Sequence, residues 1–169
     1  DVAQLLVGFM ALEALCQRYL RESVHAVSSS NVPMWHHKLL HTWCAKQLPS
    51  PSDRAMAPAD VRAAHPALWA EVQLAEQCGP WFADALSGVV ACQALLFPGG
   101  TMEAVRPVYE DAVGAAFYNG CVVVAVEAVL SLLHMERAVR ALEVGAGSGG
   151  TASSVLPVLE SACARYVFT

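Results

Sequence analysis

The sequence Leu142-Glu143-Val144-Gly145-Ala146-Gly147-Ser148-Gly149-Gly150-Thr151 decides the fold that we expect for this chain. The largely apolar residues 139–142 are typical of a short buried strand, and residues 151–159 have a helical pattern. A strand, a glycine-rich turn and a helix, in this order, bring backbone N–H groups and a helix N-terminus close to a ligand. Glycine suits the turn because a side chain would block that approach, and because such turns often require a positive φ. With the strand-like residues 165–169, the stretch predicts the first β-α-β unit of a parallel sheet.

The spacing of the glycines separates two kinds of cofactor site. The pattern here is Glu-x-Gly-x-Gly-x-Gly, whereas a dinucleotide site has Gly-x-Gly-x-x-Gly. This spacing, with an acidic residue at the strand end, resembles the first motif of class I S-adenosylmethionine-dependent methyltransferases. The resemblance implies that the turn passes against the amino-acid and ribose parts of the cofactor, and that the carboxylate orients the turn or holds the cofactor's ammonium. The cofactor-binding residues that it implies are Glu143, Gly145, Ala146, Gly147, Ser148 and Gly149. A glycine-rich turn without a ligand is the alternative.

The composition bounds the class of protein. Hydrophobic residues make up 56% of the 169 residues and charged residues only 15%, which is a low charge content for an independent soluble domain. We therefore expect much of the surface to be covered by neighbouring domains or by further chain. The net charge of −5 and the lack of a basic cluster argue against nucleic-acid binding.

The cysteines and the apolar runs indicate the cellular compartment that we expect for the protein. The six cysteines are scattered without a Cys-x-x-Cys pair, and no signal peptide is evident, so we expect reduced thiols and a cytoplasmic protein. The longest apolar run, residues 121–133, is interrupted by Glu127 and is too short to span a bilayer. We therefore expect no membrane segment.

Most of the chain before the glycine motif has a helical pattern. Residues 114–135 are apolar almost all round, which predicts a long buried helix. Further helices are expected over residues 2–20, 58–64, 67–76 and 81–86. The predicted fold class is α/β: a mostly helical N-terminal lid-type subdomain, residues 1–137, precedes a truncated class I methyltransferase (Rossmann-like) sheet, residues 138–169.

Three further stretches make the resemblance specific to one family. They are His65-Pro66-Ala67-Leu68-Trp69-Ala70-Glu71 with Glu76-Gln77-Cys78-Gly79, then Leu95-Leu96-Phe97-Pro98-Gly99-Gly100-Thr101-Met102-Glu103, and finally Phe117-Tyr118-Asn119-Gly120. In this order, ahead of the glycine motif, they resemble the C-methyltransferase domain of type I polyketide synthases. The resemblance covers roughly residues 60–169, and residues 1–59 match only as a variable helical lead-in.

The family resemblance implies a reaction and its partners. The domain would methylate the α-carbon of a β-ketoacyl chain on an acyl-carrier protein, beside neighbouring synthase domains. That carbon lies between two carbonyls and is acidic, so one positioned base can form an enolate that attacks the sulfonium methyl. In the family, the base (a His paired with a carboxylate) and the acidic residue for the ribose hydroxyls lie beyond the point where this chain stops. We therefore assign no catalytic residue and expect the fragment alone to be inactive.

Three polar residues fall in the helical part of the family that covers the cofactor and the acyl pocket. They are Tyr109, Tyr118 and Asn119. The resemblance implies that they contact substrate or cofactor. The alternative is buried aromatic packing with a hydrogen-bonded amide.

Other functions have less support in the sequence. An inactive pseudo-methyltransferase that serves as a spacer in a megasynthase would suit the low charge, but the intact Glu143 and alternating glycines favour an active site. His37, His41 and Cys44 have a helical spacing that can hold zinc, but no fourth ligand is nearby, so we expect no metal. The glycine spacing and the helical lead-in count against a nucleotide-dependent oxidoreductase.

Overall fold

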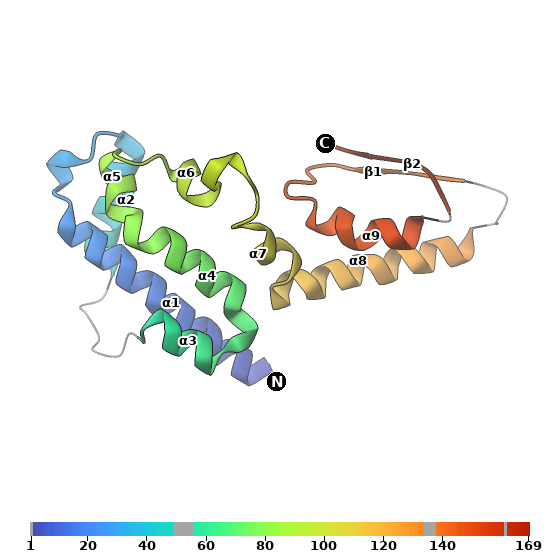
Figure 1. Ribbon diagram of the computed structural model, residues 1–169, viewed down its shortest axis with the longest axis horizontal. Coiled ribbons are helices and arrows are strands. Elements are labelled where there is room, and N and C mark those ends of the chain that lie inside the picture. The colour runs from blue at the N-terminus through green and yellow to red at the C-terminus, as the bar shows by residue number, and fades with distance from the viewer. Residues whose placement is uncertain (1, 49–55, 134–137, 161) are drawn as a thin grey trace. The chain divides into compact units, whose positions relative to one another are not determined.

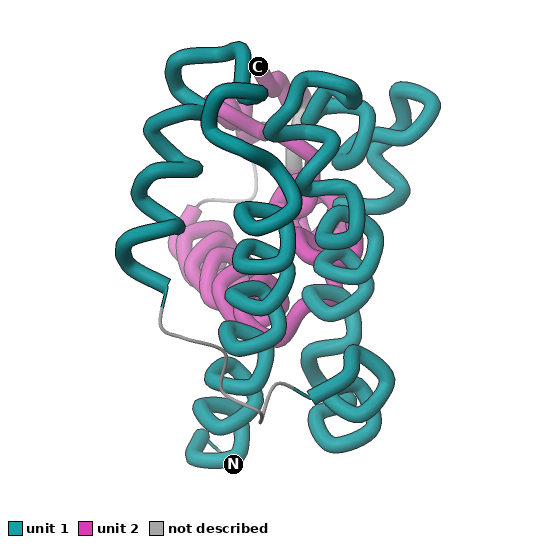
Figure 2. The backbone as a smooth tube through the Cα atoms, turned by 90° about the vertical axis from the view of Figure 1, so that its left-hand side faces the viewer, with its two compact units in different colours: residues 1–105 teal, residues 106–169 magenta. Residues whose placement is uncertain are grey.

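The computed structural model describes residues 2–48, 56–133, 138–160 and 162–169. The chain divides into two compact units, Asp1–Val105 and Arg106–Thr169, which are coloured teal and magenta in Figure 2. The domain boundary expected between residues 137 and 138 falls beside residues outside this description and stays a prediction. The compact units themselves divide earlier in the chain.

The described part of the first unit is helical (Figure 1). Pro58 and Pro66 each stand at a helix start, where the fixed φ of proline fits and its missing N–H costs nothing. Gly88 has a φ of 78° and ends one helix in the left-handed conformation that glycine adopts readily. The elements are α1 (Val2–Ala26), η1 (Ser29–Asn31), α2 (Trp35–Gln47), α3 (Pro58–Ala64), η2 (Pro66–Leu68), α4 (Trp69–Cys78), η3 (Gly79–Trp81), α5 (Phe82–Ser87), α6 (Cys92–Leu96) and η4 (Pro98–Gly100).

The core of the first unit is built on α1, which packs against α2, α3, α4 and α5. One cluster of completely shielded side chains consists of Leu15, Val61, Leu68 and Val72, which come from α1, α3, η2 and α4. The helical spacing of apolar residues along α1 places Leu12 and Tyr19 beside Leu15 in this cluster. The helix expected over residues 2–20 is confirmed and continues to Ala26.

The second unit contains the predicted β-α-β arrangement. Its elements are α7 (Arg106–Glu110), α8 (Val113–Leu132), β1 (Val139–Glu143), α9 (Gly150–Leu159) and β2 (Cys163–Phe168). β1 and β2 are parallel, with Ala141 opposite Tyr166 and Glu143 opposite Phe168. Figure 1 shows α8 and α9 together on one side of the two strands. The predicted fold class, a helical part followed by the first β-α-β unit, is confirmed.

The long helix α8 differs from expectation in two ways. Of its side chains only Asn119 is buried, so the expected burial is wrong for this chain: Tyr118 is 71% exposed and Leu132 is 81% exposed. The physical reason is that the elements described around it, two strands and the short helices α7 and α9, offer too little surface to cover a helix that is apolar all round. The second difference concerns the expected lack of a membrane segment. The 20 residues of α8 are long and apolar enough to cross a membrane, by length and composition alone. The core helix of a soluble protein meets the same criterion.

Truncation of Leu15 tests the core of the first unit. We expect Leu15→Ala to lower the free energy of unfolding by about 2–5 kcal/mol, because it leaves a cavity among fully buried neighbours. Leu6→Ala on the same helix is the matched control, since Leu6 is 60% exposed, and it should change stability by less than about 0.5 kcal/mol. Urea denaturation followed by circular dichroism measures both. Equal losses for the two variants would contradict the assigned core.

Candidate cofactor site

The glycine turn has the backbone conformation that the sequence pattern requires. Gly145, Gly147 and Gly149 have φ values of 76°, 58° and 80°, in the left-handed region that favours glycine. A Cβ atom built on Gly145 or Gly149 would meet no atom within 4 Å, and one on Gly147 would meet only the Gly145 carbonyl oxygen at 3.9 Å. The turn therefore borders open space. A backbone that is bare on this side fits the close approach of a cofactor, which side chains would prevent.

Backbone hydrogen bonds hold the turn at the end of the sheet. The N–H groups of Gly145 and Ala146 both donate to the carbonyl oxygen of Thr169, at 3.0 and 2.9 Å. The Thr169 N–H in turn donates to the carbonyl oxygen of Glu143 at 3.1 Å. The Gly149 N–H donates to the Ala146 carbonyl oxygen at 2.9 Å and closes the turn before α9. The residue after β2 therefore fixes where the turn leaves β1.

The Glu143 carboxylate is held from the neighbouring strand. The hydroxyl of Tyr166 on β2 donates to Oε2 of Glu143 at 2.7 Å, in a partly buried environment. Both residues line a groove of about 570 Å³ between α8, α9 and the strands. Most of the groove is apolar, with side chains such as Val126 and Val155, and Thr151 is a further polar residue of its lining. Glu143 therefore lies at the glycine turn, as predicted, with a hydrogen-bonding partner that the sequence analysis did not identify.

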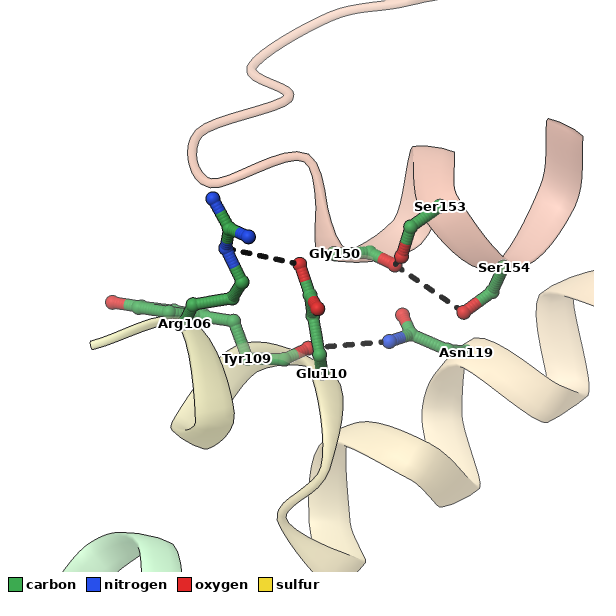
Figure 3. A network of polar contacts seen from close by, with 7 residues as sticks. All are labelled: Arg106, Tyr109, Glu110, Asn119, Gly150, Ser153 and Ser154. Carbon is green, nitrogen blue, oxygen red and sulfur yellow. Dashed lines mark hydrogen bonds and ion pairs between the residues drawn. The ribbon is translucent and has the colours of Figure 1, made fainter. Parts of the chain in front are cut away.

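Asn119 joins the three helices of the second unit. Its side-chain Nδ2 donates to the Tyr109 carbonyl oxygen at 3.3 Å (Figure 3), and its Oδ1 accepts from the Thr151 hydroxyl at 2.9 Å. Asn119 is only 8% exposed, and a buried amide needs hydrogen-bonding partners. These two contacts give a partner to its NH₂ group and a partner to its carbonyl oxygen. Asn119 on α8 therefore ties α7 to the first turn of α9, directly after the glycine turn.

A close backbone contact explains the fourth glycine of the motif. A Cβ atom on Gly150 would lie 2.6 Å from the Tyr109 carbonyl oxygen, so only glycine allows α7 to approach α9 this closely. Figure 3 shows this junction, where the hydroxyls of Ser153 and Ser154 also donate to the Gly150 carbonyl oxygen. The doubled glycine was visible in the sequence, but its close neighbour was not.

The two tyrosines expected in the lid are both solvent-exposed. Tyr109 is 56% exposed and Tyr118 is 71% exposed, so neither ring has the buried aromatic packing considered as the alternative. Tyr109 reaches the junction through its backbone carbonyl. The alternative for Asn119, a satisfied structural amide, matches its observed contacts. Contact of the three residues with substrate or cofactor stays a prediction.

The histidine and cysteine residues of α2 are engaged separately. His41 is buried and its Nε2 donates to the Val27 carbonyl oxygen at 2.7 Å, while His37 lies near the Leu86 carbonyl oxygen. Cys44 is buried, and desolvation raises the pKa of its thiol, which disfavours the thiolate that binds metal. Within the described ranges, no group of three or more His, Cys, Asp or Glu residues is arranged to hold a metal.

Alanine at position 150 tests the close contact between α7 and α9. We expect Gly150→Ala to lower the free energy of unfolding by about 1–3 kcal/mol, because the Tyr109 backbone must shift. Gly120→Ala on α8 is the control: nothing lies within 4 Å of its added Cβ, and replacing a helical glycine should raise stability by about 0.5–1 kcal/mol. Thermal and urea unfolding measure both. The same sign for the two variants would argue against the contact.

Removal of the Asn119 amide separates its structural role from a lid role. Asn119→Ala should lower the free energy of unfolding by about 1–3 kcal/mol, since it leaves the partly buried Tyr109 carbonyl and Thr151 hydroxyl with fewer partners. Ser131→Ala, an exposed position on the same helix, should change stability by less than about 0.5 kcal/mol. Unchanged unfolding of Asn119→Ala would leave ligand contact as the better interpretation.

Comparison with known proteins finds polyketide synthases among the proteins that are similar in sequence to this chain. No protein-family model matches the chain. The polyketide synthase ThaG of Burkholderia thailandensis is 40% identical over 74 residues, which are 44% of this chain and 1% of that protein. The non-reducing polyketide synthase prhL of Penicillium brasilianum is 33% identical over 111 residues, which are 62% of this chain and 4% of that protein. The chain thus spans a small part of each relative.

Solved structures share the fold over nearly the whole chain. The crystal structure of the CurJ carbon methyltransferase covers 99% of this chain with a TM-score of 0.76 and 22% identity, and that of the DszA carbon methyltransferase covers 99% with 0.71 and 24%. The chain spans 54% and 53% of those proteins, about half of each. The expected resemblance is therefore confirmed: the chain is similar in sequence to polyketide synthases, and it has the fold of part of a carbon methyltransferase domain.

Proposed function

We propose that this chain is part of an S-adenosylmethionine-dependent C-methyltransferase domain that methylates the α-carbon of a β-ketoacyl chain on an acyl-carrier protein. The observation that carries the proposal is the glycine turn at the end of β1. Its three positive-φ glycines border open space, and a carboxylate stands beside it. The relatives named as polyketide synthases and carbon methyltransferases support the same reading.

The residues of the turn fit the expected cofactor. The bare backbone of Gly145, Gly147 and Gly149 admits the amino-acid and ribose parts, and Glu143 offers a negative charge to the ammonium. Ala146 and Ser148 complete the turn between these glycines. When bound, S-adenosylmethionine supplies the methyl group as an electrophilic sulfonium. The role of this chain is to bind and orient the methyl donor. Such orientation contributes much of the rate enhancement when two reactants must meet in line.

The acceptor carbon needs a base that we do not assign to this chain. An α-carbon between two carbonyls loses its proton to a single well-placed base. We propose that this base, and the residue that holds the ribose hydroxyls, are supplied by the part of the domain that corresponds to the other half of the solved carbon methyltransferases. The chain alone would then be inactive.

The exposed apolar surface of the second unit supports this division. Side chains on α8 and β1 that are typical of a core are exposed, among them Val124 at 64% and Leu142 at 67%. Apolar patches of this kind on a soluble domain mark a surface that something else covers. In the proposed domain, further chain covers them, so α8 becomes the core helix that its composition suggests.

The matched residues make up only 1% and 4% of the two polyketide synthases, so those relatives contain much further chain beside the matched part. This supports neighbouring domains as partners. We propose neighbouring synthase domains and an acyl-carrier protein as partners, in the cytoplasm. The five cysteines whose side chains are described are free thiols, which suits a reducing compartment. An inactive domain that acts as a spacer is the alternative function.

Blocking the glycine turn tests the proposal. In the intact protein that carries this chain, we expect calorimetric titration to detect binding of S-adenosylmethionine, and Gly147→Val to weaken it by more than about tenfold, because a β-branched residue at positive φ is strained and its side chain fills the bare space. Gly99→Val is the matched control, since Gly99 also has a positive φ, of 64°, and open surroundings but belongs to the first unit and not to the glycine turn. It should lose stability without losing affinity.

The outcome for the wild-type protein separates the two functions. A well-folded intact protein that binds no S-adenosylmethionine would overturn the methyltransferase proposal and favour the structural spacer. Equal loss of affinity in Gly147→Val and Gly99→Val would mean that strain in the fold, and not the turn itself, controls binding.

A further inference from the structure

The strand register brings a tyrosine to the candidate cofactor carboxylate. Tyr166 on β2 is opposite Ala141 on β1, and Glu143 is two residues further along β1. Side chains two residues apart on a strand share one face of the sheet, and registered partners in a parallel pair do so as well. Tyr166 and Glu143 therefore point to the same face, where the phenol reaches diagonally along the sheet to the carboxylate. The distance of 2.7 Å between Oη and Oε2 is that of a short, charge-assisted hydrogen bond.

This hydrogen bond fixes a side chain that is otherwise adaptable. Burying or fixing a glutamate side chain costs rotamer freedom, whereas a tyrosine ring has only two rotatable bonds and brings its hydroxyl to one place. The phenol uses one of the two carboxylate oxygens, and the other can still accept hydrogen bonds. Tyr166 therefore limits the directions in which Glu143 presents its charge.

The same strand also fixes the glycine turn. Thr169, three residues after Tyr166, accepts hydrogen bonds from Gly145 and Ala146. The backbone of the turn is thus positioned by the main-chain carbonyl of the residue that follows β2, and the carboxylate beside it by a side-chain hydroxyl of β2 itself. A shift of β2 relative to β1 would displace both parts of the site together.

We infer that Tyr166 is a positioning residue that directs the Glu143 carboxylate toward the α-ammonium group of the bound cofactor. The inference rests on the proposed function, since it concerns the same site. It assigns to Tyr166 a role in recognising the amino-acid tail of the ligand, as distinct from its adenosine part. The role requires the hydroxyl, while the ring packs in the groove whether or not the hydroxyl is present.

Two ligands that differ only in the tail test this role. S-adenosylhomocysteine carries the α-amino acid, and 5′-methylthioadenosine has a methyl group in its place. We expect Tyr166→Phe in the intact protein to weaken binding of S-adenosylhomocysteine by about tenfold, as for a lost hydrogen bond to a charged group, and to leave 5′-methylthioadenosine within about twofold. Calorimetric titration gives both dissociation constants. Circular dichroism and the unfolding temperature verify that the variant is folded.

Two further variants sharpen the test. Tyr19→Phe in the first unit removes a hydroxyl from a tyrosine that packs against the core there, and it should leave both affinities unchanged. The single variant Glu143→Gln should weaken the binding of S-adenosylhomocysteine. Adding Tyr166→Phe to it should cause little further loss, because the tyrosine acts through the carboxylate.

Each outcome decides the inference. If the wild-type protein binds S-adenosylhomocysteine but Tyr166→Phe binds it equally well, or loses both ligands to the same degree, the positioning role is wrong and the proposed function stands. If the well-folded wild-type protein binds neither ligand, the proposed function fails and the inference fails with it. Full additivity of Tyr166→Phe and Glu143→Gln would also overturn it.

Discussion

The carbonyl oxygen of Thr169 is the contact on which the candidate site depends. It accepts hydrogen bonds from two consecutive residues of the glycine turn, so the end of β2 determines the path by which the chain leaves β1. Three left-handed glycines then make the turn tight enough for α9 to start directly beside it. Because these glycines lack side chains, the turn could adopt many conformations in the unfolded chain, and its order comes from neighbours that are far away in sequence. The turn is therefore shaped by the sheet and by α7 and α8.

The junction of α7, α8 and α9 provides the second constraint. Asn119 satisfies both of its polar groups there, and Gly150 allows the Tyr109 carbonyl to approach the start of α9. A buried amide with both partners present is worth little net free energy, but it costs much to disturb, so it favours one arrangement of the three helices over others. These contacts keep the start of α9 in a fixed position relative to α8, and the glycine turn immediately precedes that start.

The sequence predicts local structure better than tertiary contacts, and particular residues illustrate the difference. The strand, the turn and α9 could be predicted because alternate glycines between an apolar run and a helical pattern require only local geometry. The contact of Tyr166 with Glu143 could not, because it depends on the register between β1 and β2, which the five residues of one strand do not reveal. The hydrogen bond that the Thr151 hydroxyl donates to Asn119 similarly depends on how α8 packs against α9. The burial expected for α8 followed from its apolar composition alone, but composition does not show what packs against a helix, and only Asn119 of α8 is buried in the structure.

The physical features of the turn also bear on the choice between a binding site and a spacer. A spacer needs a connection between β1 and α9, and one left-handed glycine is sufficient to end a strand or helix in such a connection. Three of them next to open space cost conformational entropy and contribute no packing in return. The Glu143 carboxylate is a second cost, since a partly buried charge loses hydration that one phenol only partly replaces. Both costs are offset when a ligand with a cationic tail occupies the space, because its contacts replace the missing side chains and its charge meets the carboxylate. These physical features therefore favour the proposed binding site over a structural connector.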